Sequence, residues 1–356
     1  MASCADESDR KTGKEVSLRL GGFKILKGLW GVSVCCTSNE IESSVPLLQR
    51  ISQKKINIPY LTLSYQTGGH GYHLLCEEPK FSRFLDDHST ACLSRNNRDL
   101  TVLSLFPHRN DLRVLARVLE ITGRQKTYIH GLASSPSALS LVLDKRNLEK
   151  LTYALFGPFT FSSYRTPSDW KLAQKGKEKL FKEVVASYQE KRPKIYGLEC
   201  WRETFLAHMI LEQDSFELLR ALSAALAEQN ARLIFVNSTP TATPRKHSIS
   251  FCYTGVSEDQ IHGILQRIHI EQQDFSQQEA VILNMTGPHF GDRYGLATRL
   301  LQAMSNEGVV PLAMGCTVAS MGLVVSKIQA EKAVLAINRE FDTLGLVEKC
   351  YGINSC

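Results

Sequence analysis

The chain has 356 residues, of which 43% are hydrophobic and 22% are charged, and this is typical of a globular protein with two ordinary domains or several small ones. Its net charge of +6, from 42 basic and 36 acidic residues, is too mild to indicate a nucleic-acid partner. No stretch reaches the roughly 18 apolar residues of a membrane span, and the N-terminus is polar and mixed in charge. We therefore expect neither a membrane partner nor a secretory signal.

After a polar tail at 1–22, four segments of the chain repeat one pattern of predicted elements. They occupy 23–97, 98–163, 194–275 and 276–356, with C-terminal residues as a tail of the last one. Each begins with an apolar strand and continues through a polar loop into a helix of about three to four turns. Two more strands and a second helix follow, and this order is typical of a split βαβ unit.

The predicted elements follow in chain order. In the first segment we predict strands at 29–36, 56–65 and 71–78 and a helix at 43–54. In the second segment the strands are at 100–106, 127–133 and 138–144, and the helices at 111–122 and 147–156. In the third they are at 205–211, 231–238 and 247–254, with helices at 215–230 and 257–268. In the fourth they are at 280–285, 309–315 and 321–327, with helices at 294–308 and 329–341. Ser257 and Gln260 are spaced as a capping box.

A linker at 164–193 separates the second and third segments and is predicted to be helical. Thr166, Pro167 and Asp169 suit the N-cap, N1 and N3 positions. An apolar face runs through the linker, whereas the other face is rich in lysine; the apolar residues are Trp170, Ala173, Leu180, Val184 and Tyr188. The lysines indicate either a nucleic-acid contact or, as we prefer, the solvated face of a connecting helix.

One such segment is too small to bury both faces of its sheet, so the segments must pair. Sheets placed side by side would extend the strand ladder and cover edges that otherwise aggregate. The second and fourth segments share Pro-His after the first strand, at 107–108 and 288–289, and the first and third do not. This alternation predicts two halves, each built from two units.

The ten cysteines contain no CxxC pair and no Cys/His set at zinc spacing. Several lie in apolar strands, where a thiol acts as a small hydrophobic group. We therefore expect reduced thiols, no metal site and a cytoplasmic protein. His70 and His73, in the stretch GGHGYH, either bind a metal weakly or lie exposed in a turn, and we favour the exposed turn.

Two stretches carry a resemblance to a known family. They are RVLARVLEITGRQKTYIHGLASSPSALSLVLDKRNLEKLTYAL in the second segment and TGPHFGDRYGLATRLLQAMSNEGVVPLAMG in the fourth. Both resemble the ACT domain, and more narrowly the tandem regulatory ACT domains of aspartate kinases. The resemblance implies an α+β fold of ferredoxin-like ACT units (βαββαβ), in four copies arranged as two side-by-side pairs. In that family, two ACT units bind an amino-acid effector at their interface.

The loop that begins at Gly287 is the candidate effector site. Its glycines match neither phosphate motif, GxGxxG or GxxxxGK[ST]. A free amino acid suits it better, because N–H groups at a helix N-terminus bind a carboxylate and glycine permits close approach. Asp292 would take the ammonium group, or is only a helix-start residue. The candidate effector-binding residues are His289, Gly291, Asp292, Arg293 and Gly295 and, by the resemblance, Asp214 and Asn39; a plain turn is the alternative.

Three of the four loops depart from the family pattern. In the family an Asp opens a DRPG-like loop, and Asp214 and Asn39 stand at that position in the third and first segments. The glycine that follows is replaced there by Glu217 and Glu42. In the second segment it is replaced by Arg113, whose side chain would block a pocket. We therefore expect effector binding at the interface of the third and fourth segments.

Motifs of common catalytic sites are missing from the sequence. It has no KFGGTS-like nucleotide motif of aspartate kinases, no HExxH and no GxSxG. We therefore expect no catalytic residues and no cofactor, with an enzyme on a ferredoxin-like frame as a less favoured reading. The resemblance implies a non-catalytic protein of allosteric regulation that binds an amino acid, lysine or threonine by family analogy, as a homodimer or with a partner enzyme. The alternative is a ligand-free ACT scaffold for a separate aspartate kinase catalytic chain.

Overall fold

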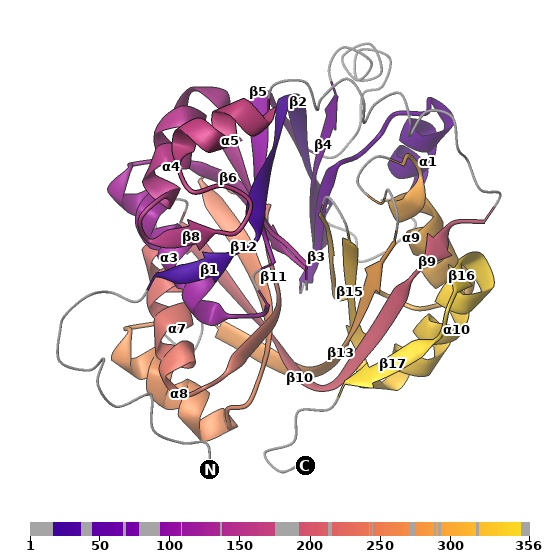
Figure 1. Cartoon of the computed structure of the whole chain (residues 1–356). Helices are drawn as coiled ribbons and strands as arrows, with labels where there is room; N and C mark the ends of the chain where they lie inside the picture. Colours follow the sequence, from indigo (N-terminus) through magenta and orange to yellow (C-terminus); the bar gives the residue numbers. More distant parts are fainter. Residues whose placement is uncertain are drawn as a thin grey trace, which may run out of the picture.

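Figure 1 shows the computed structural model of the chain. It describes residues 17–36, 45–66, 69–77, 93–107, 109–135, 137–174, 192–212, 216–241, 243, 245–270, 275–287, 290, 293–317 and 320–349. Within these ranges the chain is α+β, with helices on the outside of one large mixed sheet.

Thirteen strands form the large sheet. In chain order they are β2 (Gly22–Cys36), β3 (Tyr60–Gln66), β4 (Gly69–Glu77), β5 (Leu93–Phe106), β6 (Ile129–Ser134), β7 (Leu139–Asp144), β10 (Gly197–Glu212), β11 (Arg232–Pro240), β12 (Lys246–Thr254), β13 (Phe275–Thr286), β14 (Ala313–Cys316), β15 (Ser320–Ser326) and β17 (Leu346–Lys349). Their order in space is β12-β11-β6-β7-β5-β2-β4-β3-β14-β15-β13-β10-β17. Two small parallel pairs lie outside this sheet: β1 (Leu18–Leu20) with β8 (Phe159–Phe161), and β9 (Lys194–Ile195) with β16 (Asp342–Thr343).

The large sheet closes on itself through β10. Residues 205–212 of β10 pair with β12, and residues 205–209 also pair with β13 on the other side. The strands therefore form a ring, with β17 attached in parallel to residues 198–201 of β10. Closure of the ring satisfies backbone hydrogen bonds that an open sheet would leave at its edges.

Four strands are longer than the sequence pattern predicts. β2, β5, β10 and β13 each extend N-terminally beyond the predicted strands at 29–36, 100–106, 205–211 and 280–285. Charged residues such as Lys24, Lys27 and Arg202 interrupt the apolar pattern there. The strand pairing is also irregular, at Leu26/Leu29 of β2 and Trp201/Thr204 of β10, which breaks the alternation of faces. The pairing of β2 with β5 links the first segment to the second, and that of β10 with β13 links the third to the fourth.

Helices cover the outside of the ring in two groups, on opposite sides in Figure 1. One group is α1 (Val45–Gln53), α9 (Leu296–Asn306) and α10 (Ala330–Glu340). The other group is α3 (Leu112–Arg124), α4 (Leu148–Leu155), α5 (Pro167–Gln174), α7 (Phe216–Glu228) and α8 (Glu258–Arg267). Each group covers its own apolar cluster, with Leu48, Leu283 and Leu300 fully buried in the first and Leu141 and Leu151 in the second. Burial of each such side chain stabilises the fold by about 1.5–3 kcal/mol.

Two seams join segments that are far apart in the sequence. At one seam β3 of the first segment pairs with β14 of the fourth, and α1 packs beside α9 outside it. At the other seam β6 of the second segment pairs with β11 of the third, and α3 packs beside α7. Edge pairing thus occurs between the first and fourth and between the second and third segments.

The two seams touch each other across the inside of the ring. Asn237 of β11 donates from Nδ2 to the carbonyl oxygens of Leu63 on β3, at 2.9 Å, and of Met314 on β14, at 3.1 Å. Thr62 Oγ1 of β3 donates to the carbonyl oxygen of Ser238, at 3.1 Å. The walls come this close because glycine lines one of them: a Cβ at Gly315 would lie 3.2 Å from the ring of Phe235 on β11.

Local signals in the linker and in α8 predict the structure well. Ser257 and Gln260 form the predicted capping box of α8. Thr166 Oγ1 accepts from the N–H of Asp169, whose carboxylate accepts from the N–H of Thr166. Trp170 is buried, with its ring centroid 5.0 Å from that of Phe23. The predicted apolar positions beyond 174 and the lysine-rich face lie outside the described residues.

The histidine prediction is wrong. His70 and His73 are only 3% and 2% exposed, rather than displayed in a turn. The reason is that β4 begins at Gly69, so both side chains belong to a strand. His70 stacks on Tyr65, and His73 lies edge-on to Tyr60 inside the sheet.

Replacement of Asn237 by Ala is predicted to destabilise the protein by about 1–3 kcal/mol, because two buried carbonyl oxygens each lose a hydrogen bond. Urea unfolding measures the loss. Asn306→Ala, at an exposed position in α9, is the control and should change stability by less than about 0.5 kcal/mol. Equal effects of the two substitutions would contradict the bridging role of Asn237.

Acid is predicted to destabilise the fold through His73. Burial, with His247 and His130 nearby, lowers its pKa from 6.5 to about 3. Below pH 6.5 the unfolded chain therefore binds a proton that the folded chain excludes, and stability is lost as the pH falls from 6.5 toward 3. His73 alone lowers the free energy of unfolding by about 2 kcal/mol at about pH 5.

Urea unfolding at neutral and acid pH measures this dependence. Burial also lowers the pKa of His208, to about 4, so it acts in the same direction. His73→Gln should reduce the pH dependence, whereas His262→Gln, on the outer helix α8, should leave it unchanged. A His73→Gln variant with the full pH dependence would show that other groups cause it.

Candidate functional site

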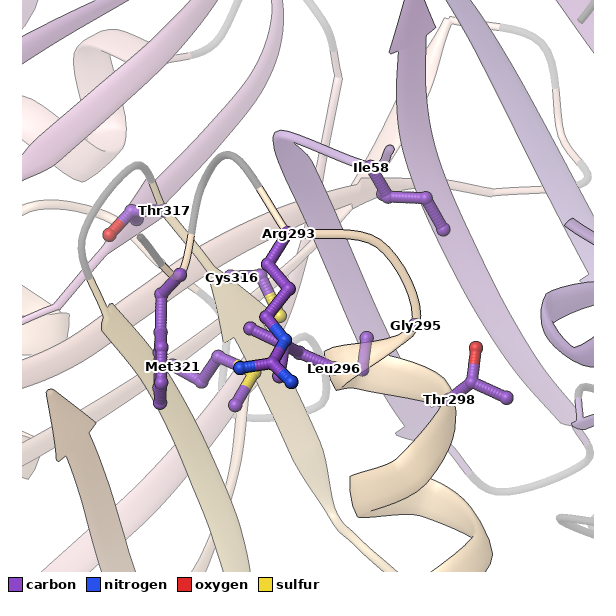
Figure 2. A pocket seen from close by; sticks show the side chains of 10 residues that line it. Ile58, Arg293, Gly295, Leu296, Thr298, Cys316, Thr317 and Met321 are labelled. Carbon is purple, nitrogen blue, oxygen red and sulfur yellow. The ribbon is translucent and has the colours of Figure 1, made fainter. Parts of the chain in front are cut away.

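A small pocket lies at the start of α9, where the fourth segment meets the first. Its empty space, counted with its opening to solvent, is about 330 Å³. Most of its lining comes from the fourth segment, and Ile58 comes from the first. The lining residues are Ile58, Phe290, Arg293, Gly295, Leu296, Ala297, Thr298, Cys316, Thr317 and Met321. Figure 2 shows the side chains that surround it.

The N-terminus of α9 forms one wall of this pocket. Its N-cap is Gly295, in the left-handed region at φ +81°, and glycine has no side chain with which to cap the helix. The first N–H groups of a helix have no partner within the helix and carry partial positive charge. This wall therefore suits a carboxylate or another anion.

Arg293 adds a full positive charge beside this wall. In Figure 2 its side chain extends alongside Leu296 and Met321. The opposite wall is neutral: burial raises the pKa of the Cys316 thiol to about 12, so it stays protonated. Thr298 and Thr317 contribute hydroxyl groups to the lining. Together these residues offer positive charge at one end and apolar surface with hydroxyl groups around it.

The pocket belongs to the seam between the first and fourth segments, not to an interface with the third as the sequence analysis expected. Thr298 Oγ1 of α9 donates to the carbonyl oxygen of Leu48 in α1, at 3.0 Å. A Cβ at Gly295 would lie 2.6 Å from Ser52 Oγ of α1. The partner is different because β14, an edge strand of the fourth segment, pairs with β3 of the first.

Two of the seven predicted site residues, Arg293 and Gly295, are brought together in this pocket. The other five lie outside the described residues: Asn39, Asp214, His289, Gly291 and Asp292. Sequence reasoning missed the contributions of Ile58, Cys316 and Met321. The predicted strands after α9 were the only signal for Cys316 and Met321. No signal identified Ile58, because nothing in the sequence indicates which segment supplies the facing wall.

The corresponding helix start in the second segment is closed by its own side chains. Asp111 is the N-cap of α3 and accepts from the N–H of Arg113 at 2.9 Å. The Arg113 guanidinium folds back on the same carboxylate, with Nη2 2.7 Å from Oδ2. The expectation that Arg113 obstructs this loop agrees with that geometry. The Asp111 carboxylate lies at the positive end of this helix, whereas the N-cap glycine of α9 supplies no carboxylate.

The described residues give no sign of a metal site or a membrane span. No three His, Cys, Asp or Glu side chains within the described ranges come together as metal ligands. None of the helices in the described part of the chain is long and apolar enough to cross a membrane. Among the described cysteines, Cys76, Cys252 and Cys316 form no disulfide bond.

Comparison with known proteins gives similarity in structure alone. No protein-family model matches the chain, and no curated protein matches it in sequence. Its structure resembles that of aspartate kinase from Synechocystis, with a TM-score of 0.72 and 13% sequence identity. That overlay covers 90% of this chain and 56% of the kinase. The chain thus has an aspartokinase-like fold and spans little more than half the length of that enzyme.

A second similarity is much weaker. The ligand-free regulatory subunit of aspartate kinase from Thermus thermophilus overlays with a TM-score of 0.37 and 12% identity, over 42% of this chain and 99% of that subunit. This value is too low to define a common fold. At 13% sequence identity, the overlay with the Synechocystis enzyme establishes an aspartokinase-like fold.

Gly295→Ala is predicted to destabilise the protein by more than the strain of a left-handed alanine, which is about 1–2 kcal/mol. The excess comes from the contact of the new Cβ with Ser52 Oγ at 2.6 Å. Gly308→Ala is the matched control, because Gly308 has φ +65° and nothing within 4 Å of a Cβ. Urea unfolding of both variants separates contact from strain.

Adding Ser52→Ala to Gly295→Ala should recover the excess, because it removes the oxygen that the new methyl group meets. The same addition to Gly308→Ala should recover nothing. If Gly295→Ala and Gly308→Ala lose equal stability, the tight packing of the α9 start against α1 is disproved.

Proposed function

We propose that this protein is a regulatory protein built from four ACT-like units, which binds a free amino acid in the pocket at the start of α9. One observation carries the proposal: Arg293 and a helix N-terminus with glycine at its N-cap line one pocket at a seam between two segments. The resemblance of the segment sequences to ACT domains and the aspartokinase-like fold support it. The unit boundaries follow the four segments of the sequence.

The amino acid would enter with its carboxylate toward the helix. The N–H groups of the first turn of α9 and the Arg293 guanidinium would hold that carboxylate. Ile58 and Met321 would contact an apolar part of the ligand, whereas the hydroxyl groups of Thr298 and Thr317 already bond to Leu48 and to Ser135 and Ser320. By analogy with the family, lysine and threonine are the first ligands to test.

Regulation would follow from the position of the pocket on a seam. Its walls come from the first and fourth segments, so a ligand that contacts both favours one relative arrangement of them. The free-energy difference between the two arrangements with ligand bound couples ligand binding to the partner that recognises one arrangement. The responding partner would be a second copy of the chain or a partner enzyme.

Two other functions compete with this one. A ligand-free scaffold is favoured by the self-capped start of α3, where Asp111 occupies the place that the carboxylate of a ligand would take. An enzyme is favoured by a different fact: the overlay on 90% of this chain is with an aspartate kinase, not with a separate regulatory subunit. Turnover of ATP in the presence of aspartate tests the enzyme directly.

Thermal unfolding with a panel of the twenty common amino acids tests effector binding. A ligand at about a hundred times its Kd should add about 2.7 kcal/mol to the stability of the folded state. Arg293→Gln should weaken binding of that ligand by about tenfold or more, because a hydrogen bond to a charged group contributes about 1.5–3 kcal/mol. Calorimetric titration measures the change in Kd.

Arg299→Gln is the matched control, because Arg299 lies on the same helix but pairs with Glu340 at 3.1 Å and does not line the pocket. Its Kd should equal that of the unchanged protein. If no amino acid raises the unfolding temperature, the scaffold is the better description. If both arginine variants bind equally well, the ligand binds elsewhere.

A further inference from the structure

A second pocket lies inside the ring and shares no residue with the α9 pocket. It is bordered by β2, β4, β5 and β6 and by the turn between β11 and β12. Its lining residues are Ser33, His73, Asn97, Tyr128, His130, Pro240, Arg245, Lys246 and His247. These residues come from the first, second and third segments, so the pocket is a point where three segments meet.

The lining of this pocket is basic and polar. Arg245 and Lys246 carry full positive charges, and three histidines stand near them. Among the described residues that line it, none is acidic. The nearest carboxylate in the hydrogen-bond network is that of Asp144, which lies 3.0 Å from His130 Nε2 and 3.5 Å from Arg146 Nη2. Asp144 is therefore already engaged by two neighbouring groups, and it does not itself line the pocket.

His73 forms a buried part of the lining with unused hydrogen-bonding capacity. It is 2% exposed, and its Nδ1 atom has no hydrogen-bond partner among the residues that the structure describes. A buried polar atom without a partner costs about 1–3 kcal/mol in general, so such atoms are rare without a functional or solvent-based reason. The His73 residue that carries this atom also lines the pocket.

The surrounding structure holds this pocket in shape. Asn97 Nδ2 lies 3.3 Å from His130 Nδ1, and Asp144 holds the other ring nitrogen, so the His130 ring is oriented from both sides. Cys35 Sγ on β2 donates to the carbonyl oxygen of Pro240, at 3.4 Å, which docks the β11–β12 turn on the first segment. The His130 ring and this turn are therefore held in place at the border of the pocket.

We propose that this pocket binds a small oxyanion, a phosphate or carboxylate group, between Arg245, Lys246 and His73. The two cations supply charge and His73 supplies a hydrogen bond from the buried side. Since the three residues belong to the first and third segments, a bound anion ties those segments together inside the ring. This site is separate from the amino-acid site proposed at α9.

Calorimetric titration of the full-length protein with inorganic phosphate and with succinate, in a buffer that contains only chloride as anion, tests the proposal. At least one probe should bind with a Kd below about 10 mM. The double variant Arg245→Gln/Lys246→Gln should weaken this binding by about tenfold or more. Arg232→Gln is the matched control, because it lies on the same hairpin at the far end of β11 and should leave the Kd unchanged.

An NMR titration of the His73 imidazole adds a readout at the site itself. Burial lowers the pKa of His73 to about 3 in the empty pocket, and a bound anion should raise it. Binding of phosphate alone, or of succinate alone, supports the site and identifies the preferred group. No binding of either probe, binding that the double variant leaves unchanged, or an unshifted His73 signal at saturation would overturn it. An amino acid that still binds Arg245→Gln/Lys246→Gln at full strength would show that the α9 site stands independently.

Discussion

Contact between the two seams through Asn237 is the constraint on which the rest of the structure depends. This side chain projects from β11, at the seam of the second and third segments, and its hydrogen bonds end on β3 and β14, at the seam of the first and fourth. Because all three strands are buried, these bonds form away from water, where an unmade bond is costly. A shift at one seam therefore disturbs the other. Both pockets are lined by residues of different segments, so a shift of one segment against another would change the shape of each pocket.

The difference between the starts of α9 and α3 shows how little sequence separates an open site from a closed one. Both helices follow a strand and a Pro-His pair. In α3 the N-cap is Asp111, whose carboxylate also holds Arg113, so the helix start is neutralised from within. In α9 the N-cap is Gly295, which has no side chain and lies against Ser52 of α1. The same fold position therefore carries an acidic N-cap in one segment and a glycine N-cap in the other.

Local signals predicted the helices, the short strands and the capping residues, because hydrophobic spacing and caps act within a few residues. The N-terminal halves of β2, β5, β10 and β13 could not be predicted, since charged residues and irregular pairing hide their strand pattern. Of the site, the sequence identified Arg293 and Gly295, which belong to one loop, but not Ile58, which belongs to a segment far away in the chain. The burial of His70 and His73 was missed because both were assigned to the hairpin turn, whereas β4 begins at Gly69 and places them against Tyr65 and Tyr60 of β3.

The long strands also limit where the chain can be divided without breaking a strand, and therefore how it can have evolved. Each of β2 and β5 serves the first and second segments at once, and β10 and β13 do the same for the third and fourth. A cut near 97, between the first two segments, would fall inside β5 and leave both pieces with a broken strand. The smallest piece that a gene duplication could copy intact is therefore a pair of segments. If a two-segment ancestor was duplicated, each copy would keep its pair of long strands whole. If single segments were added one at a time, the intermediate forms would contain a long strand with half of its length unpaired.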